Sequence, residues 1–139
     1  MFLKSLAPPL TIIVTMIFLG YNVIQLSYAR MQVIDQVGAY RDFIREQQVG
    51  IRILRKLNFR VLVFLIAFYL VLLFFSGFAW WFLFFALVKS GLSAWVSDIF
   101  HVRAIVSKKV SQSLLWMRRL DAVGNSLLLS LVLYLVVFA

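Results

Sequence analysis

The sequence contains no cysteine, a single histidine and only five acidic residues among its 139 positions. The lack of cysteine excludes disulfides, thiolate metal sites and cysteine nucleophiles. The acids are Asp35, Asp42, Glu46, Asp98 and Asp121, and we expect all of them to lie outside the membrane-spanning segments or at their edges. A proton relay or a cation site built from carboxylates within a bilayer is therefore not expected.

Candidate catalytic groups are equally scarce. His101 follows Asp98 by one helical turn, but a metal site needs three or four converging ligands. Ser90, Ser93 and Ser97 lie in an apolar run with no general base in reach, which argues against a serine nucleophile. We therefore expect no catalytic residues, no metal, no cofactor and no enzymatic activity.

Apolar residues are abundant. Hydrophobic side chains make up 64% of the chain, aromatic ones 17% and charged ones only 14%, whereas soluble domains are nearer half apolar and a quarter charged. This composition predicts an all-α polytopic membrane protein that forms a single transmembrane domain over residues 1–139. The net charge is +9, and the basic residues flank the apolar runs. We therefore expect these residues to contact anionic lipid headgroups and not nucleic acid.

Four transmembrane spans are predicted, at residues 10–28, 58–75, 77–99 and 122–139. The 28 uncharged residues between Arg60 and Lys89 would make a helix of about 42 Å, against a hydrocarbon thickness of about 30 Å. Two spans joined by a turn at Ser76 and Gly77 fit this length. The alternative is three spans with one long, tilted middle helix.

The distribution of cations favours the turn. Seven Lys/Arg lie between Arg30 and Arg60 and five between Arg103 and Arg119, and the turn places both groups on one side. The positive-inside rule then makes these segments cytoplasmic and both termini external, in a bacterial inner membrane or an organellar inner membrane. This threading puts Lys89 near the middle of the bilayer, at a cost of roughly 2.5–3.5 kcal/mol.

The two basic segments, residues 30–57 and 99–121, are predicted to be amphipathic cytoplasmic helices. In the first, a heptad-like stripe predicts that the first span continues as one helix and presents an apolar face to a partner. The stripe consists of Val33, Val37, Tyr40, Ile44, Ile51 and Leu54. The second segment repeats the pattern over a shorter length. Its end is the better candidate for a lipid-headgroup surface, with Lys108, Lys109, Trp116, Arg118 and Arg119.

Polar and small residues within the spans are candidates for helix packing or for lining a pore. They are Thr11, Thr15, Asn22, Gln25, Lys89, Ser90, Ser93 and Ser97. Helical rise places Asn22 at the depth of Lys89, so we expect Asn22 or Gln25 to accept a hydrogen bond from the Lys89 ammonium. Hydrogen bonding between helices and a water-filled pathway both account for this pattern.

No known family motif is recognised. We expect a non-enzymatic integral-membrane subunit that acts by helix–helix association, as a scaffold or accessory component of a homo-oligomer or a larger membrane complex. Its partners would be the bilayer with its anionic headgroups, and other membrane subunits or copies of itself. The alternative is a small homo-oligomeric channel or pore whose path is lined by the polar first helix and Lys89.

Overall fold

The computed structural model describes residues 1–48, 50–107 and 110–138, and these residues form five helices. The helices are α1 (Phe2–Ser27), α2 (Arg30–Gln47), α3 (Ile51–Phe75), α4 (Trp80–Ser107) and α5 (Gln112–Phe138). Four are long and apolar enough to cross a membrane, namely α1, α3, α5 and the Trp80–Ile105 part of α4. The all-helical class and the four candidate spans are therefore confirmed.

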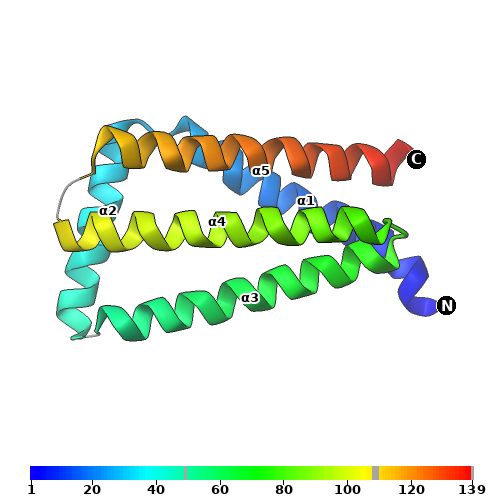
Figure 1. Ribbon diagram of the computed structural model, residues 1–139, viewed down its shortest axis with the longest axis horizontal. Coiled ribbons are helices and arrows are strands. Elements are labelled where there is room, and N and C mark those ends of the chain that lie inside the picture. The colour runs from blue at the N-terminus through cyan, green and yellow to red at the C-terminus, as the bar shows by residue number, and fades with distance from the viewer. Residues whose placement is uncertain (49, 108–109, 139) are drawn as a thin grey trace.

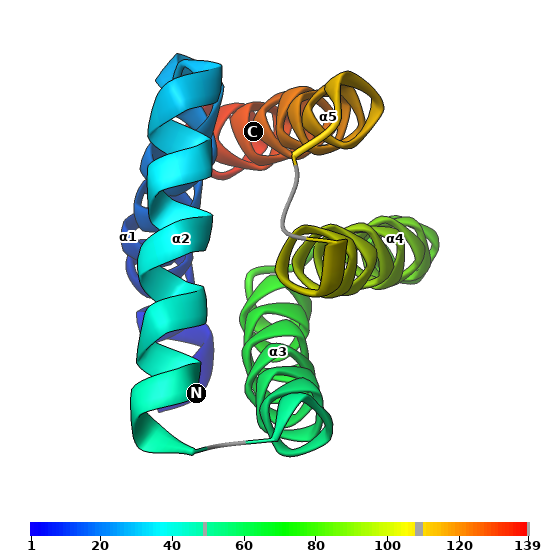
Figure 2. The ribbon, with the colours of Figure 1, turned by 90° about the vertical axis from the view of Figure 1, so that its left-hand side faces the viewer.

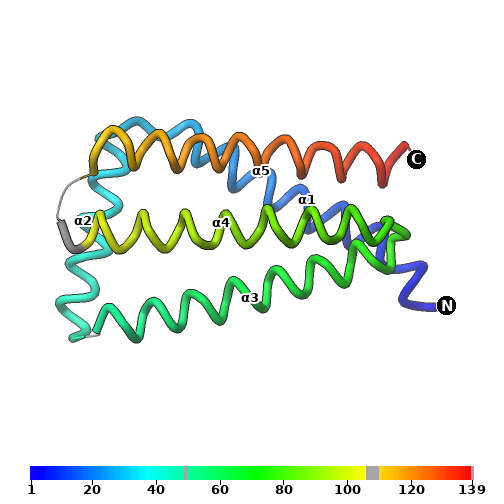
Figure 3. Tube along the Cα trace, viewed as in Figure 1, coloured from blue at the N-terminus to red at the C-terminus, as the bar shows by residue number. Residues whose placement is uncertain are grey.

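The four long helices lie side by side, and α2 lies across one end of them (Figures 1 and 2). Both termini and the turn between α3 and α4 are at the end away from α2, and the end of α4 and the start of α5 lie at the α2 end (Figure 3). The fold thus has a hairpin end, which holds the α3–α4 turn, and a basic end, which holds α2.

The uncharged block is divided between two helices, so the alternative of one long middle helix is wrong. After α3 ends at Phe75, the Phe78 N–H donates to the Leu73 carbonyl (3.2 Å) and the Gly77 N–H to the Phe74 carbonyl (3.1 Å). These bonds satisfy carbonyls at the end of α3. Gly77 has a φ of +91°, a left-handed conformation that glycine adopts without steric cost.

The expected continuous extension of the first span is wrong. Helix α1 ends at Ser27, and the extended backbone of Tyr28 (φ −71°, ψ 126°) turns the chain before α2 begins. The Gln32 side chain then accepts a hydrogen bond from the Ala29 N–H at 2.8 Å. The predicted stripe is consequently split, with its first four members on α2 and with Ile51 and Leu54 on α3.

The described residues between 99 and 121 form no separate amphipathic helix, contrary to expectation. Helix α4 continues to Ser107 and α5 starts at Gln112, so these residues belong mainly to the basic ends of two candidate spans. Apolar residues at heptad-like spacing can continue past the end of a helix. The pattern therefore did not predict that α4 ends at Ser107 and that α5 starts at Gln112.

Two apolar clusters hold the bundle together. The cluster nearer the hairpin end joins α3, α4 and α5 and contains Tyr69, Leu73, Phe82, Ala86, Leu129 and Val132. The second fastens α2 to the basic end, where Val33 and Val37 pack with Phe100, Ala104, Val110, Leu114 and Leu115. Helix α1 packs along α5 and α3. The face of α2 that was expected to receive a partner is thus partly used to cover its own bundle.

Candidate functional site

A polar cluster lies between α4 and α5. The Lys89 ammonium on α4 donates to the Asp121 carboxylate (2.8 Å) and to the Asn125 carbonyl oxygen (2.6 Å), both on α5. It also contacts the Ser93 hydroxyl one turn along its own helix (2.9 Å). The side chains of Lys89 and Asp121 are only 20% and 18% exposed. Two opposite charges are therefore held together inside the fold.

The cluster also reaches α1. The Asn125 amide nitrogen donates to the Asn22 side-chain oxygen (3.2 Å) and lies 3.3 Å from the second oxygen of Asp121. The Ser93 hydroxyl lies 2.9 Å from both the Asp121 and Asn125 oxygens. Asn22, Lys89, Ser93, Asp121 and Asn125, here called the Lys89 cluster, connect three of the four long helices.

Two expectations about this site are wrong. Lys89 does not contact Asn22 or Gln25 directly, because Asn125 lies between Lys89 and Asn22. Nor do all acids lie outside the candidate spans, since Asp121 lies within α5. The cause is that α5 begins at Gln112, well before the expected start near residue 122. The sequence signal for this site was the i, i+4 spacing of Asp121 and Asn125 beside the last apolar run, which places both side chains on one face of a helix.

Gly124 provides the space for the Lys89 side chain. A Cβ atom at position 124 would lie 2.9 Å from Cε of Lys89. At the remaining five glycines, a Cβ would meet nothing within 4 Å. The aliphatic part of Lys89 therefore lies directly against the backbone of α5, and this contact sets where its ammonium can reach.

The polar face of α1 is turned toward α3. The Thr15 hydroxyl lies 2.6 Å from the Tyr69 phenol oxygen, and the Thr11 hydroxyl 2.8 Å from that of Ser76. Both threonines are fully buried. Gln25, also on this face, has a buried side-chain oxygen without a hydrogen-bond partner among the described residues. Thr11 and Thr15 hold two helices together at the hairpin end.

The small residues of α4 do not form one uniform packing surface. Ala86 is buried in the apolar cluster nearer the hairpin end, and Ser93 belongs to the Lys89 cluster. Ser97 lies near His101, whose Nδ1 is 2.7 Å from the Ser97 carbonyl oxygen. Ser90 is half-buried. Most of this face is therefore occupied by the chain itself.

Arginines at the basic end bind backbone carbonyls. Arg119 donates to the carbonyl of Tyr28, the C-cap of α1 (3.1 Å), and Arg41 to that of Ala104 in the last turn of α4 (3.0 Å). Carbonyls at helix C-termini lack partners within the helix and carry partial negative charge, so cations are favoured there. Arg41 and Arg119 thus close the ends of α4 and α1. Arg30 donates to the carbonyl of Val110, two residues before α5 (3.1 Å).

The predicted headgroup surface is only partly available for lipid. Arg118 is half-buried, with its guanidinium carbon 4.6 Å from the centre of the Phe100 ring, and Arg119 is half-buried beside Tyr28. Trp116 is exposed. Lys108 and Lys109 lie outside the described residues.

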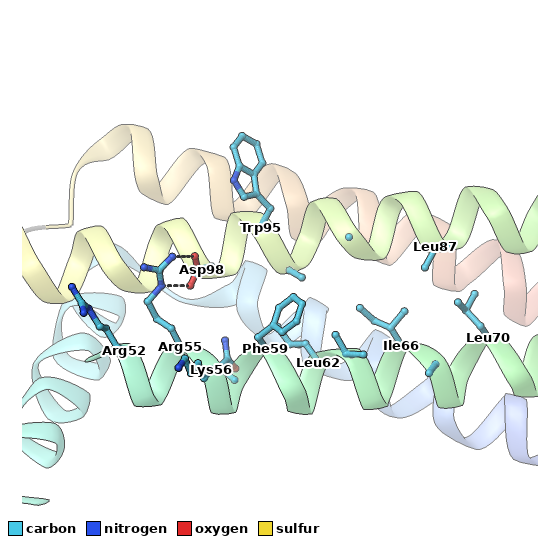
Figure 4. A pocket seen from close by; sticks show the side chains of 15 residues that line it. Arg52, Arg55, Lys56, Phe59, Leu62, Ile66, Leu70, Leu87, Trp95 and Asp98 are labelled. Carbon is cyan, nitrogen blue, oxygen red and sulfur yellow. Dashed lines mark hydrogen bonds and ion pairs between the residues drawn. The ribbon is translucent and has the colours of Figure 1, made fainter. Parts of the chain in front are cut away.

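A cavity of about 830 Å³ lies between α3 and α4, here called the α3–α4 groove (Figure 4). Its basic end is bridged by Arg55 and Asp98, whose two hydrogen bonds measure 3.0 and 2.8 Å. The residues that line it are Arg52, Arg55, Lys56, Asn58, Phe59, Leu62, Val63, Ile66, Ala67, Leu70, Leu87, Gly91, Ala94, Trp95 and Asp98. The groove is apolar over most of its length and charged at one end.

Comparisons of this chain with protein-family models, curated proteins and solved structures found no match.

Proposed function

We propose that this protein is a non-enzymatic integral-membrane subunit that acts by association, as a scaffold or accessory component of a homo-oligomer or a larger complex. The observation that carries the proposal is the pairing of Lys89 with Asp121 inside one chain. Ionisable groups within membrane spans often mark transport pathways. Here the Lys89 charge is neutralised by the Asp121 carboxylate of the same chain, as a structural role requires.

A channel is less well supported by the same contacts. Thr11 and Thr15 are fully buried and bound to α3, so within one chain they do not line a water-filled path. Lys89 binds three oxygen acceptors on its own and the neighbouring helix. A pore-lining lysine would instead direct its ammonium at passing anions.

Helix α2 is the proposed contact surface. It lies across the bundle end, so in a bilayer it would run along the membrane surface with one side turned to water. Its exposed residues include three of the five acids, Asp35, Asp42 and Glu46. Met31 and Phe43 are also exposed, at 67% and 52%. Acidic groups gain nothing from anionic headgroups, so their presence beside exposed apolar side chains favours a protein partner.

The proposed orientation follows from the cations. The basic end would be cytoplasmic, and the hairpin end with both termini would be external, in a bacterial or organellar inner membrane. In this orientation α2 meets partners from the cytoplasmic side. Trp116 would lie at the headgroup level of the same leaflet.

The particle mass in mild detergent tests the proposal, with light scattering used to subtract the detergent. We expect either a protein mass of at least two chains of 16.1 kDa each or a co-purifying protein. The double variant Met31→Ser/Phe43→Ser should reduce the particle to a monomer. Ile53→Ser is the matched control, because Ile53 is also exposed near the basic end but lies on α3.

A wild-type protein that is monomeric and carries no partner would overturn the proposal. Planar-bilayer recording addresses the channel. No current is expected, whereas a conductance that Lys89→Ala abolishes would replace the association role with a pore.

A further inference from the structure

We propose that the α3–α4 groove binds an anionic phospholipid, with an acyl chain along its apolar walls and the phosphate beside Arg52 and Lys56. The proposal does not depend on the assembly role above, because it concerns a separate surface. It rests on the shape of the groove, on the order of residues along it and on the position of its cations.

The walls of the groove suit an acyl chain. Helix α3 contributes Phe59, Leu62, Ile66 and Leu70, and α4 contributes Leu87, Gly91, Ala94 and Trp95. Figure 4 labels Phe59, Leu62, Ile66 and Leu70 in sequence along α3, and Leu87 and Trp95 on α4. From Phe59 to Leu70 the apolar wall is about 16 Å long, close to the roughly 15 Å of hydrocarbon in one leaflet. The apolar walls offer water no hydrogen-bond partners, so an acyl chain is favoured over water in the groove.

The charged end suits a phosphate. Arg52, Arg55 and Lys56 all lie in the first two turns of α3, at the basic end of the bundle. Arg55 is held by Asp98 across the mouth of the groove, whereas Arg52 and Lys56 are exposed (Figure 4). With one acid facing three cations, the mouth carries a net positive charge. Arg and Lys are the usual partners of phosphate oxygens.

The stability of α3 does not account for these cations. Positive charge at a helix N-terminus opposes the macrodipole, which favours anions there. An anionic headgroup at this position would be attracted by Arg52 and Lys56 and by the N-terminus of α3 together. The positive-inside rule accounts for cations at this end of the bundle, and a bound anion would offset their repulsion with the N-terminus of α3.

Tryptophan fluorescence provides the test, because Trp95 lines the groove. The chain has four tryptophans, so the probe is the variant Trp80→Phe/Trp81→Phe/Trp116→Phe, which retains Trp95 alone. It is reconstituted into phosphatidylcholine vesicles that contain increasing fractions of phosphatidylglycerol. In paired series, the acyl chains of one lipid or the other are brominated to quench nearby tryptophan. The matched reference retains only Trp81, which is similarly exposed (64% against 62%) but lies at the hairpin end.

We expect Trp95 to select brominated phosphatidylglycerol over brominated phosphatidylcholine by about fivefold or more, since each basic residue near an anionic surface contributes about that factor. Trp81 should show no preference. Arg52→Gln/Lys56→Gln should reduce the Trp95 preference to about one. The control Lys4→Gln/Arg45→Gln removes the same charge away from the groove and should leave the preference intact.

A second variant tests the acyl-chain site. A Cβ at Gly91 would meet nothing within 4 Å, so Gly91→Leu should fill the groove without unfolding the protein, as circular dichroism can verify. It should lower quenching of Trp95 by both lipids. Equal quenching by the two lipids in the starting protein, or undiminished quenching of Trp95 in Gly91→Leu, would overturn the proposal. Quenching of Trp81 without any quenching of Trp95 would show that a protein segment fills the groove, and would overturn it equally.

Discussion

The Lys89 ammonium on α4 lies 2.8 Å from the Asp121 carboxylate on α5, and the two charges neutralise each other inside the bundle. In hydrocarbon, each of these groups alone would carry a desolvation cost of several kcal/mol. Their pairing, together with the oxygens of Ser93 and Asn125, makes a mid-bundle lysine compatible with a membrane fold.

We predict that Lys89 and Asp121 are strongly coupled. Lys89→Met or Asp121→Leu alone should lower the free energy of unfolding by about 3 kcal/mol, because each leaves an unpaired buried charge. The double variant should be more stable than either single one. Unfolding in mild detergent, followed by circular dichroism, measures the stability of each variant. Arg45→Ala is the control, because the exposed Arg45–Asp42 pair at 3.5 Å should contribute less than about 1 kcal/mol. A double variant whose loss of stability equals the sum of the two single losses would contradict the prediction.

Gly124→Ala should have opposite effects in two backgrounds. In the wild-type chain the added Cβ meets Lys89 Cε at 2.9 Å, so the ammonium must move from its acceptors and the protein should lose stability. In a Lys89→Met/Asp121→Leu chain the ion pair is absent, so the helix propensity of alanine should restore up to about 1 kcal/mol. Gly20→Ala, where a Cβ meets nothing within 4 Å, should behave alike in both backgrounds. The same unfolding assay applies, and a stabilised wild-type Gly124→Ala would refute the close contact.

The Thr15–Tyr69 hydrogen bond should contribute modestly to the contact between α1 and α3. Tyr69→Phe removes the phenol oxygen that lies 2.6 Å from the Thr15 hydroxyl. Hydrogen bonds between membrane helices are worth about 0.6 kcal/mol on average and up to about 1.7 kcal/mol. A double-mutant cycle of Tyr69→Phe with Thr15→Val should give a coupling in that range. Tyr134→Phe, at an exposed tyrosine of α5, should change stability little, and zero coupling in the cycle would contradict the assigned bond.

Removing Arg41 should loosen the attachment of α2. Arg41→Met leaves the Ala104 carbonyl at the end of α4 without its 3.0 Å donor, so α2 should open locally more often. Faster amide hydrogen exchange in residues 30–47, with exchange in α3 unchanged, is the expected readout. Arg45→Met, at an exposed position of the same helix, should leave the exchange as it is. Equal acceleration by both variants would show that the Ala104 contact does not anchor α2.

Engineered thiols should report opposite ends of the bundle. Because the chain lacks cysteine, Ala79→Cys in the α3–α4 turn and Gln36→Cys on α2 each introduce a single label site. An impermeant maleimide should modify Ala79→Cys in intact cells, and Gln36→Cys only after permeabilisation, if the basic end is cytoplasmic. Both positions are exposed. Labelling of both from one side would refute the proposed membrane orientation.

Much of the fold was predictable because its signals are local. Long apolar runs predicted the spans, and the length of the uncharged block together with Ser76–Gly77 predicted the reversal that the structure contains. Thr11, Thr15 and Asn22 were identified from helical spacing, and Lys89 as a charge within a span, as candidates for helix packing or for lining a pore. Their partners were not, because Tyr69 and Asn125 are distant in sequence and no spacing rule connects them.

The sequence by itself determined the class of the protein: its apolar runs are long enough to form four helices that can cross a membrane. Only the tertiary structure decided where the helices end and which polar groups meet. The stripe from Val33 to Leu54 runs through the boundary between α2 and α3. An extended backbone at Tyr28 turns α2 across the bundle. Asp121 became a buried partner of Lys89 because α5 starts ten residues before the expected boundary. Helix ends and ion pairs depend on contacts between distant segments, and a one-dimensional pattern does not record those contacts.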